Sequence, residues 1–145
     1  MNWKVVSTVA FLALVVCIVF LLETGSLFGA GPVTIAIQIA AAALMLWARL
    51  TFGRRSFHAG ANPTAGELVT SGPYHYLRHP IYAAILYFAW AGIAAHPSVR
   101  NVSIGLFASA MLGLRMFSEE VLLARAYPEY AGYSLKTARV LPFIF

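Results

Sequence analysis

The chain has 145 residues and a net charge of +5, and 61% of its residues are hydrophobic while 10% are charged. Because soluble domains carry about 25% charged residues, this composition argues against an ordinary soluble domain and favours a protein embedded in lipid. The length suits one domain over residues 1–145. The single cysteine, Cys17, excludes an internal disulfide bond.

The first half of the chain contains two long apolar segments. Residues 5–22 carry no charge, and at about 1.5 Å of rise per residue a helix of this length crosses the bilayer core. Residues 33–48 are similar, with Gln38 as the only strongly polar residue before Arg49. We expect both to form transmembrane helices. A cleaved signal peptide is the alternative for residues 1–30, but the apolar run is long for one and no clean cleavage site follows it.

The second half contains two shorter apolar segments. Residues 81–95 are apolar, and residues 102–114 reach a useful length only if the helix continues through Arg115 to about Leu123. We expect a tight helical hairpin with its turn at residues 96–101. The predicted fold class is therefore an all-α integral membrane protein with about four transmembrane helices.

The basic residues lie on one side of this predicted topology. Residues 24–32 contain no Lys or Arg, and the turn near residue 100 contains only Arg100. The other basic residues are Lys4, Arg49, Arg54, Arg55, Arg78, Arg115, Arg125, Lys136 and Arg139. The positive-inside rule then places both termini and the loop 51–80 in the cytoplasm. The charge needs no nucleic-acid partner to explain it, and the compact length favours a bacterial inner membrane.

The polar run 68–82 is the most informative part of the chain, and it contains Arg78-His79-Pro80. Proline is favoured in the first turn of a helix, so Pro80 predicts the start of the third membrane helix with His79 near its cap. The amides at such an end suit a carboxylate or a phosphate, and Arg78 adds a cation. The alternative is that these residues are interfacial anchors beside lipid headgroups.

A second polar group, Arg115 with Glu119 and Glu120, lies near the end of the fourth segment. Arg115 and Glu119 are four residues apart and share a helix face, whereas Glu120 points about 100° away. Ionisable groups at membrane depth face the bundle interior and often mark a site. A self-satisfied pair of Arg115 and Glu119 is the alternative.

The tail has tyrosines at positions 127, 130 and 133, a spacing that fits one face of a short surface helix. Such a helix either lies in the membrane interface or covers a cavity as a lid. No metal is expected, because His75 and His79 are separated by the helix start at Pro80 and no Cys-x-x-Cys is present. A Gly-x-Gly-x-x-Gly fingerprint, a phosphate-binding loop and aspartate are all absent from the sequence.

Residues 66–145 resemble the isoprenylcysteine carboxyl methyltransferase family. The resemblance rests on the set Leu68-Val69-Thr70-Ser71-Gly72, Tyr74, Arg78-His79-Pro80, Tyr82, Arg115, Glu119-Glu120 and the closing Tyr130, Tyr133 and Leu141-Pro142-Phe143-Ile144. The pattern is also similar to phospholipid N-methyltransferases and, more distantly, to membrane sterol reductases. Where the family often has Phe-Gly, this chain has Tyr127-Pro128.

The resemblance implies S-adenosylmethionine as the methyl donor, in a cytoplasmic pocket formed by the central loop and the C-terminal region. The cofactor-binding residues implied by matching position are Glu67, Leu68, Val69, Tyr74, His79, Pro80, Ile81, Tyr82 and Glu119. Arg115 would face the acceptor as the catalytic residue. The implied partners are membrane lipids and a lipophilic or small amphiphilic acceptor. Carboxylate, amine and thiol acceptors stay open, as do an NADPH-dependent reductase and a non-catalytic membrane protein.

Overall fold

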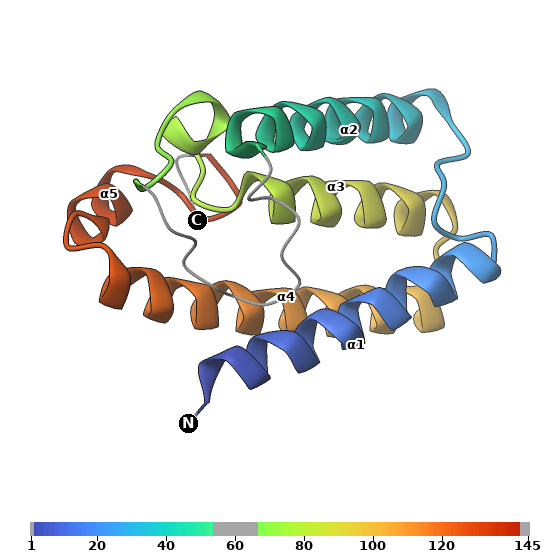
Figure 1. The fold of residues 1–145 in the computed structure, drawn as a ribbon. Coiled ribbons are helices and arrows are strands. Elements are labelled where there is room, and N and C mark those ends of the chain that lie inside the picture. Colours follow the sequence, from blue (N-terminus) through green and yellow to red (C-terminus); the bar gives the residue numbers. More distant parts are fainter. Residues whose placement is uncertain (1, 54–66, 143–145) are drawn as a thin grey trace.

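The computed structural model describes residues 2–53 and 67–142. Its elements, in chain order, are α1 (Trp3–Glu23), α2 (Pro32–Phe52), the 3₁₀ helix η2 (Gly72–His75), α3 (Pro80–Ala95), α4 (Val99–Ala126) and α5 (Tyr130–Lys136). Figure 1 shows α2 beside α3 and α1 crossing α4 obliquely. The described residues form no β-strand, and an isolated parallel bridge joins Leu77 to Ala138.

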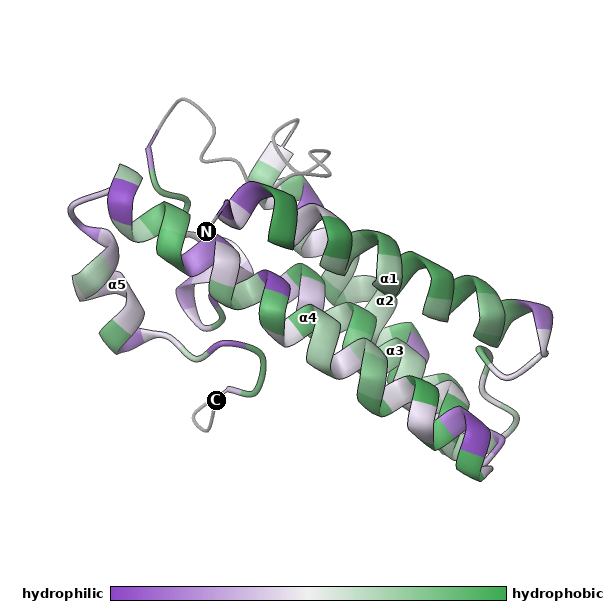
Figure 2. Cartoon of the chain, turned by 90° about the horizontal axis from the view of Figure 1, so that it is seen from below, coloured by the Kyte–Doolittle hydropathy of each residue, from purple (hydrophilic) through white to green (hydrophobic). Residues whose placement is uncertain are grey.

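Two helices, α1 and α2, have the length and hydropathy of a membrane span, while α3 is apolar but shorter. Hydrophobic residues follow the helices along their length, and hydrophilic residues gather mainly toward the ends (Figure 2). The all-helical prediction is confirmed for the described residues, whereas the count of four spans stays a prediction.

The helix boundaries follow local chemistry. Pro80 begins α3 directly after His79, as the sequence predicts. The Ser98 hydroxyl caps α4 by accepting a hydrogen bond from the Asn101 amide at 3.1 Å. From there α4 runs as one helix through Arg115 to Ala126, but it is not among the described helices that have the hydropathy of a membrane span.

The packing of α1 against α4 relies on small side chains. The buried residues recur every three or four positions on both helices, which is the spacing of one helix face. They are Ser7, Ala10, Leu14, Cys17 and Leu21 on α1, and Asn101, Gly105, Ala108, Leu112, Arg115, Met116 and Ser118 on α4. The small ones among them that lie along the middle of the two helices are Ala10 and Cys17 on α1 and Gly105 and Ala108 on α4. Small residues let helices approach closely in lipid, and this seam therefore brings α1 to the polar end of α4.

The other pair, α2 and α3, is tied to the connection between α1 and α2 by Gln38. Its side-chain amide donates to the carbonyls of Leu27 and Phe88 at 2.8 and 3.0 Å, and its Oε1 accepts from the Gly29 amide at 2.8 Å. A Cβ at Gly92 would lie 2.1 Å from the Leu27 carbonyl oxygen, so only glycine allows this approach. These contacts close the end of the bundle opposite α5.

The tail folds back on the start of α3. The Arg78 amide donates to the Ala138 carbonyl at 2.7 Å, and the His79 amide donates to the Arg139 carbonyl at 3.1 Å. The Tyr87 hydroxyl donates to the Val140 carbonyl. Tyr127 lies outside α5 in an extended conformation because Pro128 follows it, so the predicted surface helix holds only the second and third tail tyrosines.

Candidate functional site

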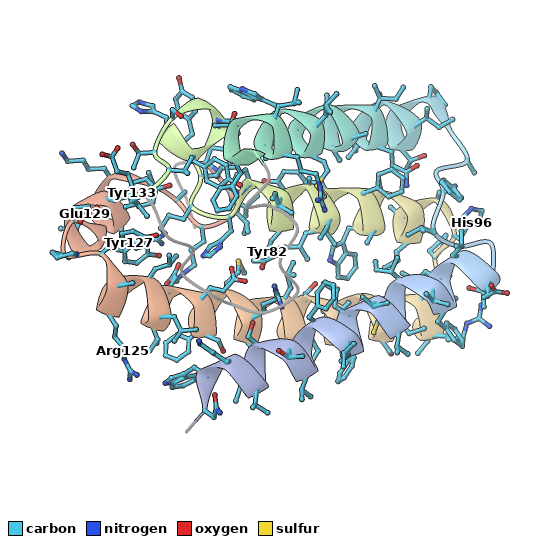
Figure 3. All side chains as sticks on the ribbon, in the orientation of Figure 1. Tyr82, His96, Arg125, Tyr127, Glu129 and Tyr133 are labelled. Carbon is cyan, nitrogen blue, oxygen red and sulfur yellow. The ribbon has the colours of Figure 1, made fainter. Side chains whose placement is uncertain are left out.

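A polar cluster lies where the start of α3 meets the last turns of α4. The Tyr82 hydroxyl donates to Glu119 Oε1 at 2.5 Å and accepts from Arg115 Nε at 2.6 Å. Arg115 Nη2 lies 3.2 Å from the same carboxylate oxygen. The His79 ring stacks on the Tyr82 ring, with centroids 5.5 Å apart, and its Nδ1 lies 3.9 Å from Glu119 Oε2. Figure 3 shows Tyr82 pointing between α3 and α4.

Arg115 is held on several sides and is 3% exposed. Its Nη1 donates to the Ser7 carbonyl at 3.2 Å. Its guanidinium carbon lies 4.8 Å from the centre of the Phe11 ring and 5.6 Å from that of Tyr82. The predicted ion pair of Arg115 with Glu119 is therefore present, but it is one part of a larger network that includes α1 and α3.

Glu120 faces a second cluster, as its turn of about 100° from Glu119 requires. Its carboxylate lies 3.2 Å from His79 Nε2, 3.4 Å from Arg78 Nε and 3.1 Å from Arg139 Nη2. The His79 ring thus lies between the two carboxylates. The sequence does not predict the pairing of Arg139 with Glu120, because the two residues are nineteen positions apart and no periodic pattern links them.

The charge of Glu120 follows from these contacts. Burial alone would raise the pKa of the carboxyl, but hydrogen bonds from His79 and Arg139 and the charges of His79 and Arg78 lower the pKa to about 2. Glu120 lies beyond the apolar part of α4 and outside α1 and α2. The hydrogen bond to Glu120 in turn raises the pKa of Arg139. The tail is therefore joined to the end of α4 by the ion pair of Arg139 with Glu120.

The remaining predicted cofactor residues lie near this cluster along the chain. Pro80 and Ile81 form the first turn of α3, and Tyr74 is buried in η2. Glu67, Leu68 and Val69 lie on the segment that leads into η2, where the first is exposed and the other two are half-buried. Their role stays a prediction. Arg54, Arg55, Phe143 and Ile144 lie outside the described residues.

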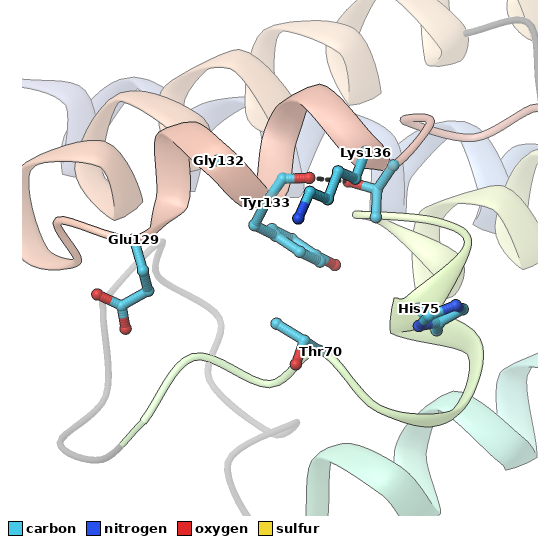
Figure 4. Close-up of a pocket in the computed structure, with 7 residues that line it drawn as sticks. Thr70, His75, Glu129, Gly132, Tyr133 and Lys136 are labelled. Atoms are coloured by element: carbon cyan, nitrogen blue, oxygen red, sulfur yellow. Dashed lines mark hydrogen bonds between the residues drawn. The ribbon is translucent and has the colours of Figure 1, made fainter.

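A pocket of about 560 Å³ lies between α5 and the segment around η2 (Figure 4). Its lining residues are Thr70, His75, Glu129, Gly132, Tyr133, Lys136 and Thr137. The Tyr133 hydroxyl donates to the Tyr74 carbonyl at 2.7 Å, and burial raises the pKa of Tyr133 to about 12. The volume suits a small molecule. None of the nine predicted cofactor residues lines the pocket, although Thr70 directly follows Val69 and His75 directly follows Tyr74.

The cluster therefore combines a carboxylate, aromatic faces, a helix start and a fixed guanidinium within a few ångströms. Carboxylates and aromatic faces attract cations, and helix starts and guanidinium groups attract anions. Such a set has groups that can attract both charges of a small zwitterion and a second polar group beside it. Among residues 2–53 and 67–142, no three side chains of the metal-binding types are grouped to hold a metal ion.

The sequence of this chain is similar to that of known proteins. The profile of the phospholipid methyltransferase family matches residues 26–130, well over half of the chain. The cobalt-zinc-cadmium resistance protein CzcN of Cupriavidus metallidurans is 33% identical over 76 residues, which cover 52% of this chain and 35% of that protein. This chain thus aligns with about a third of the length of the curated relative that it matches. No solved structure matches. The matched residues include α3 and all of α4 with both glutamates, and the chain belongs to the phospholipid methyltransferase family.

Proposed function

We propose that this protein is an integral-membrane methyltransferase that uses S-adenosylmethionine and acts on a lipophilic or small amphiphilic acceptor. Membership of the phospholipid methyltransferase family supports methyl transfer at a membrane. The observation that carries the proposal is the meeting of His79 and Tyr82 from α3 with Arg115 and Glu119 from α4.

The residues of the cluster fit the chemical groups of this cofactor. Its amino group and sulfonium are cationic, and they suit the Glu119 carboxylate and the face of the Tyr82 ring. Its carboxylate suits the Ile81 and Tyr82 amides in the first turn of α3, because Pro80 has no N–H and the Ala83 amide donates to the His79 carbonyl. When bound, the cofactor supplies a methyl group activated by the positive sulfur. The adjacent run Glu67 to Val69 and Tyr74 would complete the pocket.

In such a reaction the protein mainly positions the acceptor and the methyl donor relative to each other. Methyl transfer needs the acceptor atom, the methyl group and the sulfur in one line, so positioning supplies much of the rate. Arg115 is fixed by Tyr82, Glu119 and α1, each through a different guanidinium nitrogen. A guanidinium fixed in this way attracts an anionic headgroup or carboxylate beside it through its charge. We assign it to the acceptor.

The proposed setting is a membrane in which the cluster faces the cytoplasm. The basic residues at the cluster end of the bundle support this orientation, with both termini inside and α3 and α4 as two further spans. A polar donor then arrives from the cytoplasm and a lipophilic acceptor from the bilayer. The family name and the resemblance together leave two acceptor classes to compare, an aminophospholipid and a prenylated cysteine carboxylate.

The test is methyl transfer by the purified full chain in lipid nanodiscs. Cofactor with a labelled methyl group is supplied with phosphatidylethanolamine or with N-acetyl-S-farnesylcysteine, which carries a carboxylate on an isoprenoid tail. We expect the label in the lipid extract with one of the two acceptors. A chain that inserts but transfers no label to either acceptor contradicts the proposal.

A further inference from the structure

The N-terminal helix α1 contributes to the polar cluster although it lies outside the stretch matched by the family. The match begins at residue 26, and α1 ends at Glu23. Even so, two of the groups around Arg115 come from α1: the Ser7 carbonyl and the Phe11 ring. The family relationship alone assigns no role to this helix.

The contact with the Ser7 carbonyl depends on close helix packing. Ser7 is fully buried, and its carbonyl lies in the interior of α1, where one lone pair serves the helix and the other accepts from Arg115 at 3.2 Å. A larger side chain at position 7 would push α1 away from α4. The seam of small residues therefore lets the main chain of α1 serve as a hydrogen-bond acceptor for the site.

The Phe11 ring lies one helical turn further along and restricts the guanidinium from a second direction. The guanidinium carbon is 4.8 Å from the centre of this ring and 5.6 Å from that of Tyr82, so the cation is bounded by two aromatic groups from different helices. The electrostatic attraction between a cation and the face of an aromatic ring strengthens as the pair is shielded from water. An arginine side chain has many rotamers, and each such contact removes some of them.

We infer that α1 completes the acceptor site, with Phe11 as a positioning residue that fixes the guanidinium of Arg115. This inference rests on the proposed function and assigns a part of it to a helix that the family match leaves out. Phe11 acts through Arg115 and does not touch the cofactor site formed by His79 and Glu119. Its loss is therefore expected to alter acceptor use and to spare cofactor affinity.

The chain offers a matched control at the other end of the same helix. Phe20 on α1 packs against Arg100 on α4, with the guanidinium carbon 5.7 Å from the centre of the ring. Phe20→Leu removes the same kind of contact from the same pair of helices, far from the cluster. Phe11→Leu and Phe11→Met remove the ring at the site, whereas Phe11→Tyr keeps it.

Each variant is assayed in nanodiscs with labelled cofactor and the two acceptors named above, and cofactor affinity is measured by calorimetry. We expect Phe11→Leu and Phe11→Met to lower kcat/KM for the acceptor about tenfold with cofactor Kd within about twofold. Phe11→Tyr and Phe20→Leu are expected to match the unmodified chain. The calorimetric Kd also reports whether each variant is folded.

Two results overturn the inference in different ways. If the unmodified chain is active and Phe11→Leu behaves like Phe20→Leu, or loses cofactor affinity in proportion to activity, α1 has no specific role at the acceptor. If the unmodified chain methylates neither acceptor, the proposed function fails and the inference fails with it.

Discussion

Tyr82 on α3 and Glu119 on α4 are joined by a hydrogen bond of 2.5 Å across thirty-seven residues of sequence. The same Tyr82 oxygen accepts from Arg115, so one hydroxyl connects the proposed cofactor and acceptor sides of the cluster. The two hydrogen bonds of the Tyr82 hydroxyl thus also join α3 to α4 within the site.

Removing this hydroxyl tests whether the connection matters for chemistry. In Tyr82→Phe the ring stays against His79, but Arg115 Nε and Glu119 each lose a buried partner, which costs about 1–3 kcal/mol. We expect turnover to fall about tenfold to a hundredfold. Tyr76→Phe is the control, because Tyr76 is 54% exposed. Equal rates for the two variants would show that the hydroxyl has no part in turnover.

The cofactor assignment predicts loss of binding without loss of insertion. Glu119→Gln removes the negative charge proposed for the cationic part of the cofactor, and His79→Ala removes the ring that lies between Glu119 and Glu120. We expect neither variant to bind S-adenosylmethionine detectably by calorimetry. The control variants are Glu23→Gln and His96→Ala. Both residues lie at the opposite end of the bundle, where His96 bonds to the Phe28 carbonyl, and both variants are expected to bind S-adenosylmethionine normally. Unchanged binding in both site variants would reject the assignment.

Arg115 is expected to separate binding from turnover. Arg115→Ala should leave cofactor Kd within a fewfold and lower kcat by at least tenfold, because the guanidinium is assigned to the acceptor. Arg100→Ala, on the same helix at the far end, serves as the control. A parallel loss of cofactor affinity and turnover would mean that Arg115 only orders the pocket.

The Glu120 cluster predicts a specific acid dependence of stability. Its folded pKa of about 2 lies below the unfolded value of 4.5, so its contribution is fully present above pH 4.5 and is lost as the pH falls toward 2. We expect the thermal midpoint of the chain in detergent to fall through this window. The thermal midpoint of Glu120→Gln should be lower than that of the unmodified chain above pH 4.5 and should fall less as the pH is lowered. Parallel curves for both proteins would show that the carboxylate gains nothing from Arg139 and His79.

Substitutions at two glycines test the helix packing at the end of the bundle opposite α5. Gly92→Ala places a Cβ 2.1 Å from the Leu27 carbonyl oxygen, so backbone must move and the thermal midpoint should fall. Gly113→Ala on α4 meets nothing within 4 Å and removes a poor helix former, so its midpoint should hold or rise. A stable Gly92→Ala variant would contradict the described approach of α3 to residue 27.

The parts of the fold that sequence predicts are those with local causes. Pro80 marks the start of α3 because proline suits a first helical turn, and Arg115 with Glu119 pair because they are four residues apart on α4. The predicted helices α1 and α2 have the length and hydropathy of membrane spans, whereas α3 is shorter.

The parts that sequence does not predict depend on contacts between distant segments. The pairing of Arg139 with Glu120 and the three bonds of Gln38 arise only when the tail and the connection before α2 fold back. The contact of Phe11 with Arg115 joins residues near opposite ends of the chain. A neutral aromatic residue in an apolar helix carries no sign that it will lie against a cation.

The most direct test of the account is a thermal-shift measurement on the full chain with S-adenosylmethionine and, separately, with NADPH. A ligand that binds only the folded protein raises its midpoint, by an amount that grows with concentration above Kd. We predict a saturable rise with S-adenosylmethionine and none with NADPH. A rise with NADPH alone, or no rise with either compound, would contradict a methyltransferase site at Tyr82 and Glu119.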